Sequence, residues 1–271
     1  MGSGLFVFRL EDGDDADQRY ESSLDKRNMR YAIISNINGN LEALTACLAH
    51  IDRQSIDRII CLGDMVGECT DPGPCVELIR NRAYATVAGN HDWNATGKRS
   101  LRLFGPSAKQ VALRNRDHLS DEQKKWLDQL PLVGTSHGFA VTHASFHEPG
   151  TSWYIRTDTE AELCLAALTK LGHRLGFTAH SVPAPAVITD RRVVYAKTPD
   201  VAIDPNQATV ICPGAIGQPH DDDPRATYAI FDTECSRVHW YRVAYDIASA
   251  AGKIRAAGLP DFMAERLFVG R

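Results

Sequence analysis

The chain has 271 residues, with 30 Lys and Arg against 34 Asp and Glu, and 44% of its residues are hydrophobic. This length suits one large domain or two small ones with a real core, and the composition excludes disordered, fibrous and disulfide-dense proteins. A formal net charge of -4 argues against a broadly basic protein that coats nucleic acid polymers.

The pattern of apolar residues predicts neither a signal peptide nor a membrane helix. The first apolar run, residues 5–8, is broken by Arg9, and no run approaches the ~18 residues of a membrane helix. It lacks a cationic leader and a small-residue cleavage site, and seven cysteines without a Cys-x-x-Cys pair favour reduced thiols. We expect a cytoplasmic protein with no membrane partner. With no heptads or repeats, we expect a monomer or a simple dimer.

The chain begins with an acidic stretch that has neither helical nor strand periodicity. We expect a poorly ordered leader at 1–28 and a single domain at 29–271. The first half of that domain alternates two kinds of element: strands at 30–35, 57–62 and 83–88, and helices at 41–51 and 72–81. Polar residues follow each strand, which is typical of α/β proteins with a site at one sheet edge.

The second half of the chain is richer in short strands. We predict them at 139–142, 175–178, 186–189, 192–195, 209–212, 228–231 and 238–243. Helices are predicted at 120–130, 159–171, 247–257 and 260–267. This order favours two sheets packed face to face with helices outside.

Five loops at strand ends concentrate side chains that bind metals. They are Asn36-Ile-Asn38, Gly63-Asp64, Gly89-Asn-His-Asp92, Thr142-His143 and Thr178-Ala-His180. Sites for hard metal ions gather carboxylate, amide and imidazole donors from several loops. The glycines before Asp64 and Asn90 permit tight turns that direct the next side chain inward. Any one of these loops also fits a plain turn, so the order of all five is the informative signal.

In order and spacing, these loops resemble the motifs of the calcineurin-like metallophosphoesterases. That family's usual pattern is D-x-H, G-D-x-x-[GD], G-N-H-[DE], a late His and G-H-x-H. The likeness covers about residues 30–271. Within the family, the chain is similar to a bacterial branch of small single-domain members, and the segments that resemble this branch are 39–44, 143–145, 153–154, 213–219, 223–228 and 245–267. The resemblance implies an α/β fold, a four-layer α/β/β/α sandwich of two mixed sheets flanked by helices.

The resemblance also implies roles for individual residues. One metal position would be formed by Asn36, Asn38, Asp64 and His180, and the other by Asp64, Asn90, His143 and Thr178. A metal-activated water would attack phosphorus, and His91 would stabilise the transition state or protonate the leaving oxygen. Asp92 would orient the His91 imidazole, and Asn90 and His91 would also contact the substrate.

Three of these metal positions depart from the family pattern. Asn36 stands where the family has Asp, and Asn38 and Thr178 stand where it has His. Two dications held close together repel strongly, and this sequence keeps only Asp64 as a carboxylate to offset the repulsion. We therefore expect one divalent ion rather than two. Nitrogen and oxygen donors favour manganese, iron or zinc.

Two further features lie in segments similar to the family's substrate side. Arg225 follows a run of acids, where it would either bind a phosphate bidentately or form a surface salt bridge with its neighbours. The aromatic pair Trp153-Tyr154, in residues 144–158, would either face the substrate or contribute to packing. Both pairs of alternatives stay open from the sequence.

Two functions fit the retained residues. The first is a divergent metal-dependent phosphoesterase that hydrolyses a small phosphomonoester or phosphodiester, and the pair His91-Asp92 favours it. The second is a catalytically inactive relative that binds a phosphorylated ligand or a protein partner, and the losses at Asn36, Asn38 and Thr178 favour it. Asn36 and Asn38 also suit a deliberate inactivation, whereas Thr178 indicates natural divergence.

Overall fold

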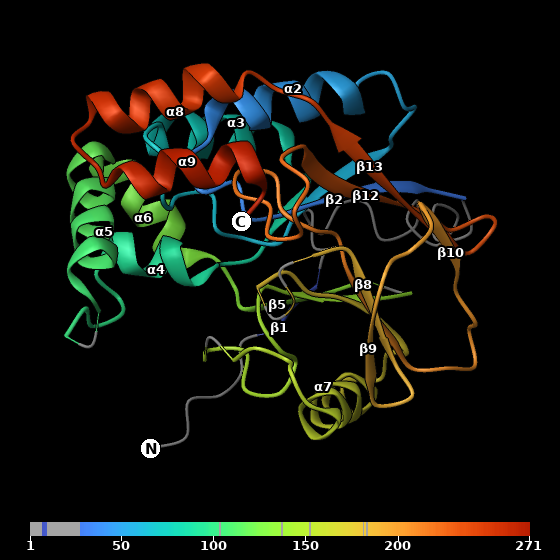
Figure 1. The fold of residues 1–271 in the computed structure, drawn as a ribbon. Coiled ribbons are helices and arrows are strands. Elements are labelled where there is room, and N and C mark those ends of the chain that lie inside the picture. The colour runs from blue at the N-terminus through green and yellow to red at the C-terminus, as the bar shows by residue number, and fades with distance from the viewer. Residues whose placement is uncertain are drawn as a thin grey trace, which may run out of the picture.

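The computed structural model describes residues 7–9, 28–102, 104–136, 138–151, 153–180, 182 and 184–271. Two β-sheets pack face to face, and helices cover the outer face of each (Figure 1). The expected four-layer α/β/β/α sandwich is therefore confirmed. No helix in the described ranges is long and apolar enough to span a membrane.

The six-stranded sheet carries the first strands of the domain. Its order is β10 (Asp200–Ala202), β13 (Arg237–Val243), β12 (Ala226–Asp232), β2 (Arg30–Ile34), β3 (Arg58–Cys61) and β4 (Ala85–Thr86). Strands β2, β3 and β4 are parallel, and β12 and β13 are antiparallel to their neighbours. The carboxyl ends of β2, β3 and β4 therefore meet at one edge.

The seven-stranded sheet is also mixed. Its order is β1 (Val7–Arg9), β5 (Val133–Thr135), β6 (Ala140–Thr142), β7 (Leu175–Phe177), β11 (Thr209–Cys212), β8 (Ala186–Thr189) and β9 (Arg192–Tyr195). Strands β6 and β7 are parallel, so the residues that follow them leave the sheet on the same side.

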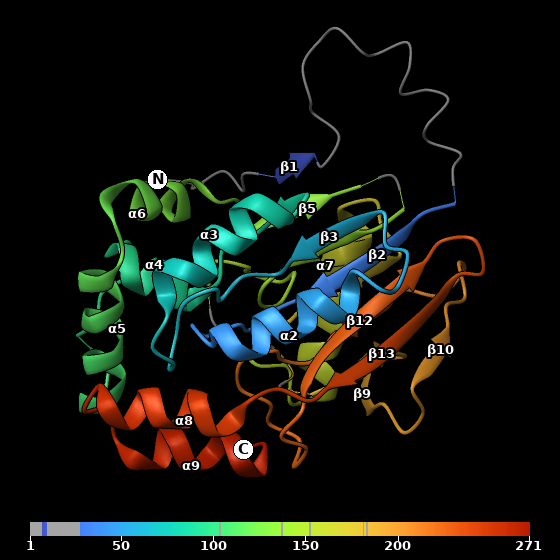
Figure 2. The same ribbon diagram turned by 90° about the horizontal axis from the view of Figure 1, so that it is seen from above.

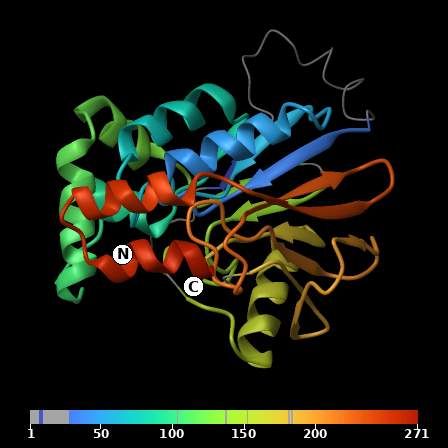
Figure 3. The same cartoon turned by 45° about the horizontal axis from the view of Figure 1, so that its top comes forward.

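The helices lie on both sides of the sheet pair (Figure 1), and the view from above shows that most of them gather over the six-stranded sheet and beyond one end of it (Figure 2). They are α2 (Leu41–Ile51), α3 (Pro72–Arg82), α4 (Asn90–Thr96), α5 (Pro106–His118), α6 (Asp121–Gln129), α7 (Asp158–Lys170), α8 (Ile247–Ala256) and α9 (Asp261–Val269). Helices α2 and α3 cover the six-stranded sheet, and α7 packs on the other sheet. The red α8 and α9 pack against each other beside α2 (Figure 3).

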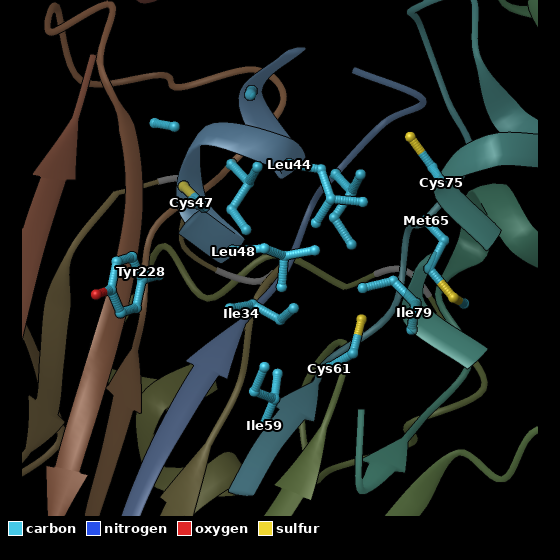
Figure 4. Packing of buried hydrophobic residues seen from close by; sticks show 14 of the residues in the cluster. Ile34, Leu44, Cys47, Leu48, Ile59, Cys61, Met65, Cys75, Ile79 and Tyr228 are labelled. Carbon is cyan, nitrogen blue, oxygen red and sulfur yellow. The ribbon is translucent and has the colours of Figure 1, made fainter. Parts of the chain in front are cut away.

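Three apolar layers hold the sandwich together: one between α2, α3 and the six-stranded sheet, one between the two sheets, and one between the seven-stranded sheet and α7. Along β2, Ala32 and Ile34 face the helices, whereas Ile33 faces the second sheet, because successive strand side chains point to opposite faces. Ile34 meets Leu44 and Leu48 of α2 in the helix-side layer (Figure 4). The fully buried strands thus read as continuous apolar runs, as strands covered on both faces do.

Several short elements differ from the sequence predictions. Residues 83–88 form only the two-residue β4, and the predictions missed β5, β10, α4 and α5. Two- and three-residue strands are too short for a period-2 pattern, and a neighbouring strand from elsewhere in the chain stabilises them. Within the expected leader 1–28, Val7–Arg9 form β1 and pair with β5. The rest of that leader up to residue 27 lies outside the described residues.

Candidate metal centre

The five predicted loops converge at the carboxyl ends of β2, β3 and β4 in one sheet and of β6 and β7 in the other. Asp64 follows β3 and Asn90 follows β4, while His143 follows β6 and His180 follows β7. Among the described residues, Asp64, His143 and His180 bring ligand atoms within 4.8 Å of one another. The structure therefore gathers from two sheets a group that the sequence places far apart.

Left-handed backbone shapes the first two loops. The φ angles of Asn36, Asn38 and Asp64 are 49°, 53° and 54°, a region that asparagine and aspartate enter more readily than other side chains. The Asn36 N–H donates to the Gly63 carbonyl at 3.1 Å, and the Asn38 N–H donates to the Asp64 carbonyl at 2.9 Å. These bonds lock the two loops together side by side.

Two glycines let the second and third loops touch. A Cβ on Gly63 would collide with the backbone of Gly89, and one on Gly89 would collide with Asp64. Both positions must therefore lack a side chain, which is the structural reason for the two glycine-led motifs.

His143 is oriented by a backbone acceptor. Its Nδ1 lies 2.6 Å from the Leu62 carbonyl oxygen, which can only accept, so Nδ1 carries a proton. Its Nε2 then points at Asp64 Oδ2 and Asn90 Oδ1, each 3.2 Å away. A hydrogen bond of this kind on the far nitrogen is the usual arrangement behind a metal-ligating histidine.

The charges of this group call for a cation. Burial raises the pKa of Asp64, but His143 and His91 outweigh it and hold the pKa well below its ordinary value. Burial lowers the pKa of His143, but the Asp64 charge and hydrogen bond raise it overall. The raised pKa of His143 favours a proton on the imidazole beside the buried carboxylate, and a divalent ion would offset the same negative charge.

Neutral oxygens line the other position. Asn38 is 6% exposed, and its Oδ1 is buried and accepts no hydrogen bond from any residue that the structure describes. That oxygen fills the space left by the missing side chain of Gly67. A buried acceptor without a donor suits a nearby cation. Among the described residues, Asp64 and His180 are the stronger donors beside this position, and the donor set as a whole fits a divalent ion.

Asp92 contacts the backbone of the loops around it, and the orienting role that the resemblance implied for it stays a prediction. It is fully buried, and its two carboxylate oxygens accept backbone N–H groups from four residues. The donors are Gly89, Asp64 and Met65 at 2.9 Å each and Val66 at 3.3 Å. These bonds tie the two glycine-led loops together through the Asp92 carboxylate.

Glu68 is the residue that the sequence analysis missed beside His91. Its Oε1 lies 3.5 Å from His91 Nε2, while Asp64 Oδ2 lies 4.0 Å from the same nitrogen. Burial lowers the pKa of His91, but Glu68 and Asp64 raise it overall. A carboxylate one position after the Gly63–Gly67 motif was the available signal. The contact itself depends on the tertiary fold.

Thr178 lies against the segment that carries His143. It is fully buried, and its hydroxyl donates to the carbonyls of Ala144 and His143. The side chain therefore ties down the segment that carries His143. These contacts give Thr178 a structural role, and its role as a metal ligand stays a prediction.

Arg225 forms the surface salt bridge that was one of its two alternatives. Its guanidinium donates to both carboxylate oxygens of Asp223, and 52% of its side chain is exposed. The anionic partner neutralises this cation.

The aromatic segment after β6 does reach the centre. The Tyr154 ring lies 4.5 Å from the His180 ring, centroid to centroid, with the planes 34° apart. Arg99 and Trp93 line a small cavity together with Asn90 and His143. Tyr154 thus forms one wall of the site, whereas the sequence gave no signal for Arg99.

This fold and donor set define a metallophosphoesterase site, and comparison with known proteins agrees. The chain belongs to the calcineurin-like phosphoesterase superfamily, since the model of that superfamily's domain matches residues 29–236. Members of this family are phosphoesterases, which are hydrolases.

Relatives from bacteria and archaea match nearly the full chain. An uncharacterized protein of Methanocaldococcus jannaschii, MJ0912, is 36% identical over 244 residues, which are 89% of this chain and 98% of that protein. The crystal structure of a metallophosphoesterase from Sphaerobacter thermophilus is 35% identical with a TM-score of 0.80, covering 90% of this chain and 100% of that one. The hypothetical protein PH1004 of Pyrococcus horikoshii shares the fold at 21% identity and a TM-score of 0.73, over 89% and 98% of the two chains.

Proposed function

We propose that this protein hydrolyses a small phosphomonoester or phosphodiester with one divalent ion held by Asp64, Asn90 and His143. The observation that carries the proposal is the arrangement around His143 Nε2, which faces two ligand oxygens at 3.2 Å while Leu62 holds the opposite ring nitrogen. Manganese, iron or zinc suits this mixed nitrogen and oxygen set.

Each residue has a chemical task in this proposal. A bound ion would lower the pKa of a water molecule and offset the charge of the phosphoryl group. The protonated His91 imidazole, favoured by Glu68 and Asp64, binds a phosphoryl oxygen or gives its proton to the leaving oxygen. Asn90 starts α4 beside it and orients the phosphoryl group, and Asp92 keeps both loops in place.

A second candidate function is phosphate-ester binding without turnover. The observation that favours it is the neutral pair Asn36 and Asn38, which leaves Asp64 as the one carboxylate among the residues aligned with the family's metal positions. Protonated His143 and His91 would then bind the ester electrostatically.

We further propose that residues 29–271 form one domain, although the family match ends at residue 236. Helix α8 lies beyond the match, and its Lys253 forms ion pairs with Glu42 of α2 at 2.6 Å and with Asp71 at 2.8 Å. This bridge and the α8–α9 apolar cluster join the last helices to the rest of the fold.

Metal analysis and kinetics test the main proposal. Protein purified without chelators is analysed for bound metal, and then assayed with p-nitrophenyl phosphate and bis-p-nitrophenyl phosphate in added manganese. We expect about one equivalent of metal, and a loss of turnover of at least about 1000-fold in Asp64→Asn, because that change removes the anionic ligand.

Asp52→Asn is the matched control, because Asp52 is an exposed carboxylate at the far end of α2. It should keep both metal and turnover. Absence of metal and of turnover in the unmodified protein, with phosphate esters still bound, would establish the second function instead.

A further inference from the structure

A stack of three side chains leads outward from the metal centre. The Tyr154 ring packs on His180 at 4.5 Å, and the guanidinium carbon of Arg156 lies 4.4 Å from the centre of the Tyr154 ring. Ile155, between them in sequence, is 4% exposed and belongs to the apolar layer under α7. The buried residue anchors the segment, so Tyr154 and Arg156 are held at the rim of the site.

The side chain of Arg156 is exposed and carries a positive charge. Within the described part of the chain, its guanidinium forms no ion pair, and the Tyr154 ring is its contact. The neighbouring acid, Glu160, uses Oε2 to accept the backbone N–H groups of Arg156 and Thr157 at 2.8 and 2.9 Å. By contrast, Asp223 holds the guanidinium of Arg225. Arg156 is thus an exposed arginine beside the centre that can accept a new anion.

The stack also fixes the reach of this cation. Two contacts in series place the Arg156 guanidinium carbon about 9 Å or less from the His180 ring centre. A substrate whose phosphoryl group lies at Asp64 and His143 would extend past Tyr154 toward Arg156. An arginine fork binds phosphate or carboxylate through paired N–H groups.

We propose that Arg156 binds a second oxyanion of the substrate, so that the preferred substrates are small phosphate esters with a second phosphate or carboxylate at the other end. The inference rests on the proposed phosphoesterase function and names its substrate class. Tyr154 is the spacer between the two anionic groups, and Arg156 recognises the end that is not cleaved.

Phosphonates that cannot be hydrolysed test this without turnover. The manganese-loaded protein is titrated calorimetrically with α,ω-alkanediphosphonates of increasing chain length, with ω-carboxyalkylphosphonates, and with alkylphosphonates of matched length. We expect the best diphosphonate to bind about tenfold more tightly than its alkylphosphonate, and the advantage to shrink as salt is added. The carboxylate series shows which of the two oxyanions is preferred.

Variants assign the effect to one side chain. In Arg156→Ala the advantage of the second anion should fall below about twofold, and Arg156→Lys should keep part of it, because lysine retains charge without the fork. Arg225→Ala should keep the full advantage. Thermal unfolding of each variant checks that the fold is intact, as expected for exposed side chains.

Three results would overturn the proposal. One is an equal advantage in Arg156→Ala and the unmodified protein, and another is its loss in Arg225→Ala alone. The third is turnover of p-nitrophenyl phosphate together with no preference for any second anion, which would reject the inference while leaving the phosphoesterase function standing. If even the alkylphosphonates fail to bind and no substrate turns over, both proposals fail together.

Discussion

The two halves of the metal centre share a backbone design but differ in their ligands. On one side, Asp64, Asn90 and His143 converge, and a backbone carbonyl sets the histidine. On the other, Asn36 and Asn38 adopt the same left-handed backbone, yet they offer neutral amides. The backbone conformation of such loops can therefore persist when the metal ligands change, because backbone hydrogen bonds maintain it.

The largest effect is expected when a ligand is removed from the half formed by Asp64, Asn90 and His143. His143→Ala removes an imidazole aimed at Asp64 and should weaken manganese binding by at least about 100-fold. Asn36→Ala should weaken it by less than about threefold, since the neutral amide adds little. Equilibrium dialysis measures both affinities, and equal losses in the two variants would contradict the unequal halves.

The next largest effect tests the scaffold that both halves share. Asp92→Ala leaves four buried backbone N–H groups without their acceptor and should lower the free energy of unfolding by about 3 kcal/mol or more. Asp92→Asn keeps the shape but turns one acceptor into a donor, so a smaller loss is expected. Denaturant titration compares them, and an unchanged midpoint in Asp92→Ala would show that these bonds do not hold the loops.

Restoring the ligands that are missing around Asn36 and Asn38 should create the second metal position. The double variant Asn36→Asp, Asn38→His supplies the charge and the imidazole that the family pattern has at these positions. We expect bound manganese to rise from about one to about two equivalents and turnover to increase about tenfold. Mass spectrometry of metal content gives the answer, and Asn38→Ala, which adds no ligand, should stay near one equivalent.

The smallest effect concerns the ion pair outside both halves. The Arg225 hydrogen bonds lower the pKa of Asp223 to about 2, more than burial raises it. This stability is present above the ordinary pKa of about 4 and is lost as the pH falls toward about 2. Arg225→Ala should therefore cost less than about 1 kcal/mol at neutral pH, because the pair is exposed, and almost nothing near pH 2. Unfolding at several pH values measures the difference, and a constant cost down to pH 2 would contradict this assignment.

Sequence patterns predicted the parts of the fold that long apolar runs define. The layers formed by β2, β3 and α2 follow from alternation and helical spacing, and the order of the ligand loops placed them at one edge. The sequence could not show that Asp92 turns toward the backbone of the neighbouring loop or that Glu68 approaches His91. In each contact the two residues lie on different loops, which only the tertiary fold brings together.

The contacts of Thr178 and Tyr154 also depend on the tertiary fold and could not be predicted from the sequence. Aligning Thr178 with a histidine of the family pattern suggested a ligand, but its hydroxyl finds backbone carbonyls within its short reach. Tyr154 was recognisable as an aromatic near the site, yet only the folded loop shows which histidine it contacts.

The four backbone bonds to Asp92 have a consequence for how an ion is captured. Because the protein itself holds the loops around Asp64 and Asn90, their shape does not wait for a ligand. Such preorganisation reduces the conformational entropy lost on binding. The metal ligands of such a centre can therefore be substituted in evolution while the hydrogen-bonded backbone of the loops keeps its conformation.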